Sequence, residues 1–151
     1  MKKLSLVLFI VSLAFIFNSV ACTASSLEDV ENDASRGIQK AQCELGCALW
    51  SGTFGNIAEE NYRSIPRNVN KACNLLKQGV DSDTHGEPTE STYSFIVDAL
   101  NALGSYYEVE AADMAQAKLY YKRSADLFVK FDGEFAGTIA GRNYMRLVAE
   151  E

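Results

Sequence analysis

A short pattern that recurs along the chain constrains its fold more than any other feature. Residues 41–46 and 99–104 both read Ala-x-x-x-Leu-Gly, and residues 136–141 repeat the pattern with alanine in place of leucine. A glycine inside a helix costs about 1 kcal/mol relative to alanine. Its recurrence therefore predicts that another helix approaches the chain closely at these points. A large side chain follows each glycine three positions later: Leu49, Tyr107 and Tyr144.

The segments that follow the first two copies of the pattern also correspond to each other. Residues 71–77 (Lys-Ala-Cys-Asn-Leu-Leu-Lys) align with residues 116–122 (Gln-Ala-Lys-Leu-Tyr-Tyr-Lys). We expect Ala72 and Ala117, within these segments, to provide the small surfaces opposite the two glycines. A helical hairpin of this kind cannot bury its apolar stripe alone, so stacked neighbours must supply the core.

From residue 34 onward, the apolar residues follow a helical spacing rather than the alternation of strands. Residues 52–67 are expected to be a loop, with at most a turn of helix at 57–62, and residues 81–89 are the clearest break. Asn68 is the expected cap of the second helix. No segment predicts a strand, so the fold class is all-α. The helices are predicted over residues 34–50, from after Pro66 to 79, 91–107, 113–131 and 133–149.

The first 21 residues (1–21) have the pattern of a secretory signal peptide. Two lysines precede a nearly unbroken apolar run over residues 4–17, and small residues follow it. The run is shorter than the ~20 residues that a membrane-spanning helix needs. Cys22 follows an alanine, and this arrangement resembles the lipobox of bacterial lipoproteins, in which the cysteine carries the lipid. Ser19 departs from the aliphatic residue usual there, and a soluble periplasmic product is the alternative.

The composition of the rest of the chain excludes nucleic acid as a partner. Cleavage after residue 21 leaves 12 basic and 20 acidic residues. Such a surface repels phosphate groups, so membrane attachment would depend on the lipid on Cys22. Residues 22–33 are polar and acidic with little periodicity and are predicted to form a flexible tether. The repeat domain is predicted over residues 34–149.

The recurring segments resemble the Sel1-like branch of the tetratricopeptide repeats. Residues 41–46 (Ala-Gln-x-x-Leu-Gly), then Gly52 and residues 65–72 (Ile-Pro-Arg-Asn-Val-Asn-Lys-Ala), look like one Sel1-like repeat. Residues 99–125 are similar to a plain tetratricopeptide unit, and residues 136–147 resemble the first helix of a third. The resemblance implies a short solenoid of about two and a half α/α hairpins. The first hairpin departs from the family because its turn is much longer than that of the second.

Repeat proteins of this family bind partners on the concave face lined by the first helix of each unit. Transferred by position, this face contains Trp50, the expected anchor, because aromatic residues dominate binding hot spots. The alternative is that Trp50 closes the core and the rest of the face is solvated. The full set is Lys40, Cys43, Cys47, Trp50, Asp98, Asn101, Ser105, Glu108, Thr138, Arg142 and Met145.

No arrangement of residues predicts catalysis. His85, the only histidine, lies in an acidic loop, and a role as general base or metal ligand would need Asp81, Asp83 or Glu87 beside it. Because no nucleophile accompanies it, a solvated loop histidine is the preferred interpretation. No phosphate-binding loop, nucleophile elbow or zinc-protease motif occurs. We therefore expect a protein that is not an enzyme, with no cofactor and no metal.

The cysteines leave alternatives open. With Cys22 lipidated, Cys43, Cys47 and Cys73 remain, an odd number in an oxidising compartment. Cys43 and Cys47 are too far apart for an unstrained disulfide within a helix. A bridge from one of them to Cys73, with Cys47–Cys73 as the named pair, is one interpretation, and buried free thiols are the other. A soft-metal site would need ligands that cannot be placed.

Three classes of function remain. The first is an exported, lipid-anchored or periplasmic module that binds another protein, either as an immunity protein against a secreted toxin or as an envelope adaptor. The second, suggested by the same resemblance, is a cysteine-containing Sel1-like hydrolase or β-lactam-binding protein. That use needs a cysteine pair in each repeat, and residues 100–125 contain none. The third is a purely structural lipoprotein. The sequence favours the first.

Overall fold

The computed structural model describes residues 26–56, 61–131 and 133–150, and these are mostly helical. The predicted signal peptide and Cys22 lie outside the described residues. Within the described ranges, no helix is long and apolar enough to cross a membrane. The elements are α2 (Leu27–Ser35), α3 (Gln39–Ser51), β1 (Thr53–Asn56), β2 (Asn61–Ser64), α4 (Val69–Asp81), α5 (Tyr93–Val109), α6 (Met114–Phe131), the 3-10 helix η2 (Phe135–Gly137) and α7 (Ile139–Ala149).

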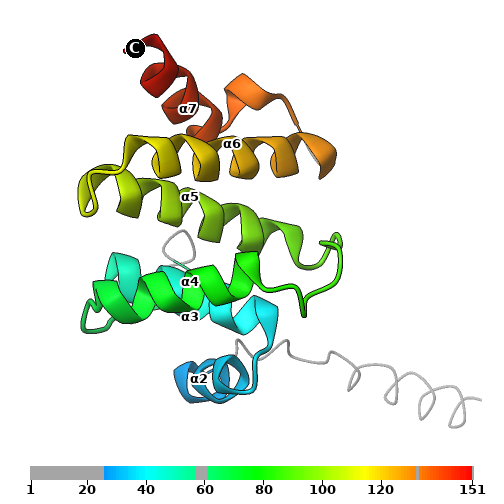
Figure 1. The fold of residues 1–151 in the computed structure, drawn as a ribbon. Coiled ribbons are helices and arrows are strands. Elements are labelled where there is room, and N and C mark those ends of the chain that lie inside the picture. Colours follow the sequence, from blue (N-terminus) through cyan, green and yellow to red (C-terminus); the bar gives the residue numbers. More distant parts are fainter. Residues whose placement is uncertain (1–25, 57–60, 132, 151) are drawn as a thin grey trace, which may run out of the picture.

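The helices form one stack in which neighbours in sequence are neighbours in space (Figure 1). α3 and α4 pack as one antiparallel pair and α5 and α6 as a second, with α2 against the first pair and α7 against the second. Both α3 and α4 also contact α5. The first helices of the two pairs, α3 and α5, therefore lie side by side.

One glycine in each helix pair allows the two helices to pack closely, as the sequence predicts. A Cβ atom at Gly46 would lie 2.7 Å from Cγ of Leu76 on α4, and one at Gly104 would lie 2.5 Å from Cδ1 of Tyr121 on α6. The facing side chains are not the two alanines expected there but the residues four positions beyond them. Those alanines are buried in clusters on the outer side of each pair. Leu76 and Tyr121 thus occupy corresponding places.

Most of the segment 22–33, expected to be a flexible tether, forms helix α2 instead. The Ser26 hydroxyl accepts a hydrogen bond from the Asp29 backbone N–H at 3.1 Å, and the Asp29 carboxylate accepts one from the Ser26 backbone N–H at 3.1 Å. This reciprocal cap satisfies backbone donors that a helix otherwise leaves unpaired. Val30 and Ala34 are buried in the cluster that α2 shares with α3. Capping and burial together therefore order the segment.

The first predicted helix, residues 34–50, is divided in two. Gly37 has a φ of +81°, a left-handed conformation that glycine adopts without strain, so the chain turns between α2 and α3. Helices α4, α5 and α6 lie close to their predicted ranges, whereas the last predicted helix, residues 133–149, is divided into η2 and α7. Asn68 caps α4 as expected, because its side-chain oxygen accepts a hydrogen bond from the Lys71 N–H at 3.0 Å. The last helix, α7, begins after Thr138, which caps it.

The long turn after α3 contains a two-stranded antiparallel hairpin, where the sequence predicts a loop and no strand. β1 and β2 pair Thr53 with Ser64 and Phe54 with Arg63. The Arg63 guanidinium also lies 5.8 Å from the centre of the Phe54 ring. Each strand has four residues, too few for an alternating pattern to be recognised in the sequence.

The core consists of three apolar clusters. One lies among α2, α3 and α4, a central one lies among α3, α4, α5 and α6, and the third lies mainly between α6 and α7. Trp50 packs against the first two clusters, and Tyr107 packs against the central and the third. These two half-buried aromatic side chains connect the clusters.

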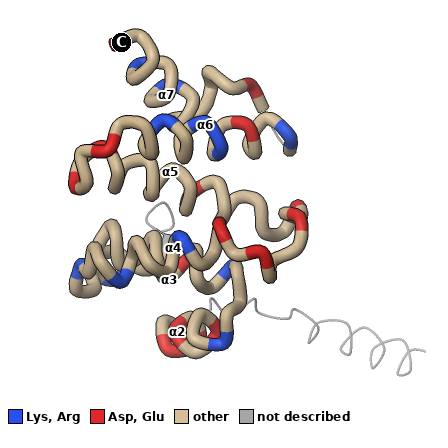
Figure 2. Tube along the Cα trace, in the orientation of Figure 1, with Lys and Arg blue, Asp and Glu red and all other residues tan. Residues whose placement is uncertain are grey.

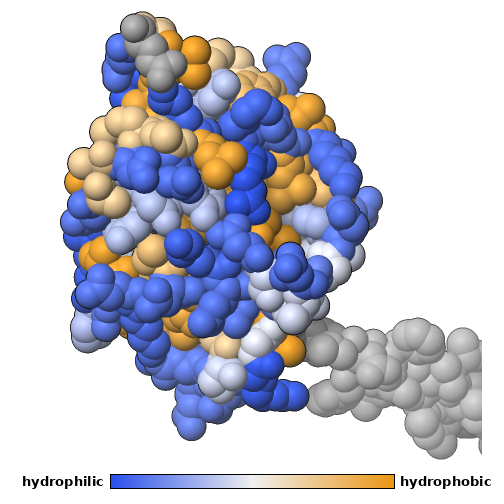
Figure 3. Space-filling model, viewed as in Figure 1, coloured by the Kyte–Doolittle hydropathy of each residue, from blue (hydrophilic) through white to orange (hydrophobic). Residues whose placement is uncertain are grey.

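The surface is polar, with apolar residues scattered across it. Figure 3 shows hydrophilic side chains over most of the visible face and apolar ones between them. Acidic residues gather in the connection between α4 and α5 (Figure 2). Two ion pairs join this region to α6: Arg123 with Asp81 at 2.6 Å and Lys130 with Glu87 at 3.4 Å.

Candidate partner-binding face

Five of the predicted residues of the first two units, Lys40, Cys47, Trp50, Asp98 and Asn101, lie where α3 and α5 are side by side. At one end, the Lys40 ammonium lies 4.5 Å from the centre of the Phe95 ring. At the other, Trp50 contacts Tyr106 edge to face, with ring centroids 6.2 Å apart. We call the surface between these contacts the α3–α5 face. It comprises Lys40, Glu44, Cys47, Trp50, Phe95, Asp98 and Asn101.

Two carboxylates lie close to the Cys47 thiol on this face. Burial raises the pKa of Cys47, and the charges of Asp98 and Glu44 raise that pKa further. Loss of surrounding water raises the pKa of both carboxylates as well, and Lys40 partly offsets the effect for Glu44. The ion pairs of the described chain include neither Glu44 nor Asp98. Such carboxylates gain from a donor or cation that another molecule supplies.

One turn beyond Asp98, the side-chain oxygen of Asn101 lacks a hydrogen-bond partner. Among the described residues, its Oδ1 is the only buried side-chain oxygen or nitrogen in this state. A buried acceptor without a donor costs about 1–3 kcal/mol. This unsatisfied acceptor lies beneath the α3–α5 face.

Trp50 is held in place from the side of the long turn. Arg67 Nε donates to the Trp50 carbonyl oxygen at 2.8 Å, and the Arg67 guanidinium lies 4.7 Å from the centre of the indole ring. The same guanidinium pairs with Glu110 at 3.0 Å. Trp50 thus packs against the core and also forms one edge of the α3–α5 face. The sequence reasoning missed Arg67 and Glu110, because they are far apart in the chain and no local pattern links them.

Not every predicted residue belongs to this face. Cys43 is fully buried, with its Sγ 2.7 Å from the position of a Cβ at Gly79, so it packs between α3 and α4. Its inclusion in the face was wrong, because it lies on the side of α3 that packs on α4. Ser105 and Glu108 are turned toward α6, where both hydrogen-bond to Tyr121, and the Glu108 bond measures 2.9 Å.

The residues predicted from the third unit lie on α7, which α5 and α6 separate from α3 (Figure 1). Arg142 donates to the backbone carbonyl of Gly137 at 2.9 Å, and Met145 is exposed. The link from α7 to α5 is instead the ion pair between Arg146 and Glu108. The structure therefore joins two of the three predicted units into one face.

His85 has structural partners. Its Nε2 lies 3.2 Å from both the Gln42 side-chain oxygen and the Gln78 carbonyl oxygen, so the ring ties the α4–α5 connection to α3 and α4. Asp81 and Glu87, weighed as its acidic partners, pair with cations of α6. In the ranges that the structure describes, no group of three His, Cys, Asp or Glu residues could hold a metal ion.

The three cysteines of the described chain are free thiols. Cys47 and Cys73 pack against the same central cluster, but the disulfide considered between them is not formed in the structure. Burial raises the pKa of Cys43 to about 12 and also raises the pKa of Cys73. Because the thiolate is the reactive form, such thiols are weak nucleophiles at neutral pH.

Comparison with known proteins gives no relative: no family model, no curated protein and no solved structure matches this chain. The Sel1-like resemblance therefore depends on the residues and packing of the chain itself. On the described surface, the α3–α5 face combines two carboxylates that belong to no ion pair of the described residues with the half-buried ring of Trp50.

Proposed function

We propose that this protein binds another protein through the α3–α5 face, without catalysis. The observation that carries the proposal is that two partly dehydrated carboxylates, Glu44 and Asp98, lie beside the Cys47 thiol and belong to no ion pair of the described residues. Both carboxylates gain hydrogen-bond donors when a partner covers the face. Trp50, at the edge, adds apolar contact area of the kind that dominates binding energy at interfaces.

The proposed scaffold is a short Sel1-like or tetratricopeptide-like solenoid. Its support is the internal correspondence of the two helix pairs: Gly46 and Gly104 have equivalent neighbours, Leu76 and Tyr121, at the same offset from the aligned alanines. The first helices of the two pairs lie side by side, as in stacked repeats. In this proposal α7 is the first helix of a third, incomplete unit.

The proposed location is the bacterial cell envelope. The pattern of residues 1–21 supports export, and Cys22 supports attachment to a membrane through a lipid, with a soluble periplasmic form as the alternative. The partner in this compartment is either a secreted toxin, against which the chain is an immunity protein, or an envelope component, for which it is an adaptor.

The chemistry of the face predicts the kind of surface that binds it. Glu44 and Asp98 are its carboxylates, and they outnumber its one cation, Lys40. Complementarity of charge gives specificity at protein interfaces. We therefore expect the partner to present lysine or arginine side chains to the α3–α5 face.

Affinity capture with a charge-reversed face tests this proposal. The tagged full chain and its Asp98→Arg variant are isolated from the native envelope, and the retained proteins are identified by mass spectrometry. Glu90→Arg is the matched control, because it makes the same change at an exposed residue of the α4–α5 connection. We expect the wild-type chain and Glu90→Arg to retain one stoichiometric partner and Asp98→Arg to lose it.

Two outcomes contradict the proposal. If no chain retains a partner, the protein-binding function fails. If all three chains retain the same partner equally, the interface lies elsewhere on the molecule. Thermal unfolding of each variant establishes that a lost partner reflects the face and not a lost fold.

A further inference from the structure

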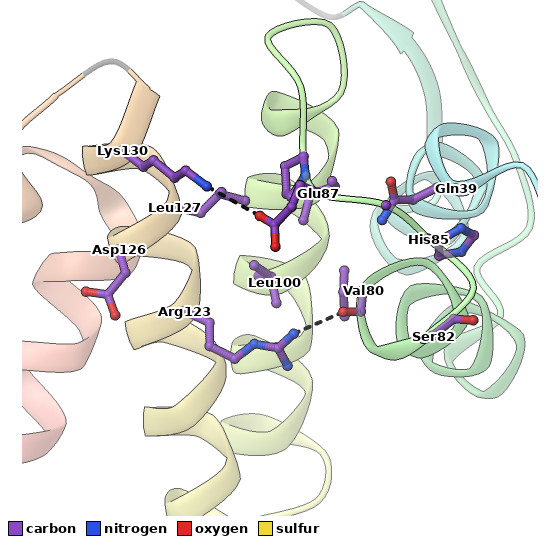
Figure 4. A pocket seen from close by; sticks show the side chains of 13 residues that line it. Gln39, Val80, Ser82, His85, Glu87, Leu100, Arg123, Asp126, Leu127 and Lys130 are labelled. Atoms are coloured by element: carbon purple, nitrogen blue, oxygen red, sulfur yellow. Dashed lines mark hydrogen bonds and ion pairs between the residues drawn. The ribbon is translucent and has the colours of Figure 1, made fainter.

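A pocket of about 420 Å³ lies between α6 and the α4–α5 connection (Figure 4). Its apolar lining comes from three helices: Val80 at the end of α4, Ile96 and Leu100 of α5, and Leu127 of α6. Ile96 and Leu100 are buried members of the central cluster. The volume falls within the roughly 300–1,000 Å³ range of small-molecule sites, so the pocket has room for one small ligand.

Two cations of α6 reach into this pocket beside its aliphatic lining, Arg123 from one side and Lys130 from another (Figure 4). The Arg123 guanidinium donates to Asp81 at 2.6 Å and to one backbone carbonyl oxygen at 3.0 Å. A guanidinium has five N–H donors, so Arg123 can donate to a ligand as well. Asp126, between the two cations on α6, pairs instead with Lys122 at 2.6 Å. The α6 wall of the pocket is thus cationic.

A carboxylate of the chain itself already occupies the mouth of the pocket. Glu87 extends from the α4–α5 connection toward Lys130, and the two charged groups are 3.4 Å apart. The pair is weak, because the Glu87 side chain keeps 89% of its surface exposed and the distance is long. A carboxylate from outside can therefore take the place of Glu87 at small cost.

We propose that this pocket binds a small aliphatic carboxylate of the size of a medium-chain fatty acid. Its chain lies against Leu100 and Leu127, and its carboxylate binds Lys130 and Arg123 and displaces Glu87. The cations favour an anion over a neutral chain of equal length, and the aliphatic lining disfavours a small hydrophilic anion. The site shares no residue with the α3–α5 face, so it is a second function beyond protein binding.

Calorimetric titration of the full chain with octanoate tests the proposal. Octanamide is the matched probe, because it has the same aliphatic chain and no charge. We expect saturable binding of octanoate and about three- to tenfold weaker binding of octanamide, the range that a partly exposed charge interaction supplies.

Substitutions of single charged residues should change the affinity for octanoate in different directions. Lys130→Gln is expected to weaken octanoate binding about three- to tenfold, because it removes the cation at the mouth. Glu87→Gln is expected to strengthen binding about twofold, because it removes the competing carboxylate. Lys122→Gln is the control: it removes a cation of the same helix that pairs with Asp126 and does not line the pocket. Because Lys122→Gln also leaves the pocket-lining Asp126 without its partner, a second control is Lys71→Gln, which removes an exposed cation of α4 far from the lining residues. The affinity of the Lys71→Gln variant for octanoate should not change.

The proposal is overturned if octanoate gives no saturable heat, if octanamide binds equally well, or if Lys71→Gln weakens binding as much as Lys130→Gln. If Glu87→Gln weakens octanoate binding, the ligand carboxylate does not displace Glu87 from Lys130. Tighter binding of a peptide that ends in a free leucine overturns the assignment to a small molecule. All four substituted side chains are exposed, and thermal unfolding checks each fold. None of these results depends on the capture experiment with Asp98→Arg.

Discussion

Gly104 of α5 lies so close to the ring of Tyr121 on α6 that a methyl group at this glycine would lie 2.5 Å from Cδ1 of the ring. The ring has little room to withdraw, because Tyr121 is 2% exposed and its hydroxyl donates to Glu108 at 2.9 Å. Packing, and not an unusual backbone conformation, therefore requires glycine at this position.

Gly104→Ala should destabilise the protein by about 1–3 kcal/mol, because overpacking of a tight interface outweighs the better helix propensity of alanine. The control is Gly86→Ala, where an added methyl group meets no atom within 4 Å. That change should stay within about 0.5 kcal/mol. Urea unfolding measures both. If the two variants have the same free energy of unfolding, the α5–α6 interface can rearrange to accommodate the methyl group.

Val30→Ala tests whether α2 belongs to the folded core. Val30 is 3% exposed in the cluster with α3, so removing two methyl groups should lower the free energy of unfolding by about 1–2.5 kcal/mol. Glu31→Ala, the exposed neighbour on the same helix, should change it by less than about 0.5 kcal/mol. If both variants unfold like the wild type, the segment behaves as the tether that the sequence predicted.

Stability should fall in alkaline solution. Burial raises the pKa of Cys43 from 9.0 to about 12 and raises the pKa of Cys47 and Tyr121. The unfolded chain releases these protons at lower pH than the folded chain, so it binds fewer protons above about pH 9 and is favoured there. Each group lowers the free energy of unfolding by up to about 1.4 kcal/mol per pH unit.

Urea unfolding under reducing conditions, at intervals between about pH 7 and about pH 10.5, measures this decline. Cys43→Ala should show a shallower decline, because it removes one of the groups with a raised pKa. A free energy of unfolding that is flat across this range would mean that the thiols titrate alike in both states.

Cys22→Ser should release the protein from the membrane. The wild-type chain is expected to carry a lipid on Cys22 and to fractionate with membranes, because residues 1–22 resemble a signal peptide that ends at a lipidated cysteine. Intact mass and fractionation measure both properties. Cys47→Ser, which leaves the N-terminal pattern intact, should remain with the membranes. Soluble wild-type protein would favour the periplasmic alternative.

The sequence predicted the elements whose signals are local and long. The apolar spacing placed α5 and α6, Asn68 marked the start of α4, and the glycines marked the close contacts between helices. The residues facing those glycines could not be predicted, because the register of two packed helices depends on how all their side chains fit together. Leu76 therefore stands where Ala72 was expected.

Helix α2 was missed although its signal was present. Ser26 and Asp29 have the spacing of a reciprocal N-terminal cap, and Val30 and Ala34 lie on one helical face. The acidic composition of the segment outweighed this pattern in the prediction. Of the candidate site, position in the repeat pointed to Trp50 on α3 and Asp98 on α5, two helices that lie side by side. The pocket, by contrast, assembles residues of separate helices and has no local signature.

Trp50 and Tyr107 each pack against two of the three apolar clusters, and this sharing affects how the protein unfolds. In a stack whose layers touch only their neighbours, either end can melt while the rest persists. Trp50 packs against both the α2 cluster and the central cluster, and Tyr107 packs against both the α7 cluster and the central cluster. We therefore expect these two rings to contribute to cooperative unfolding of the described helices, together with the helices that the clusters share. A partner that binds against Trp50 should slow the unfolding of both layers that this ring contacts.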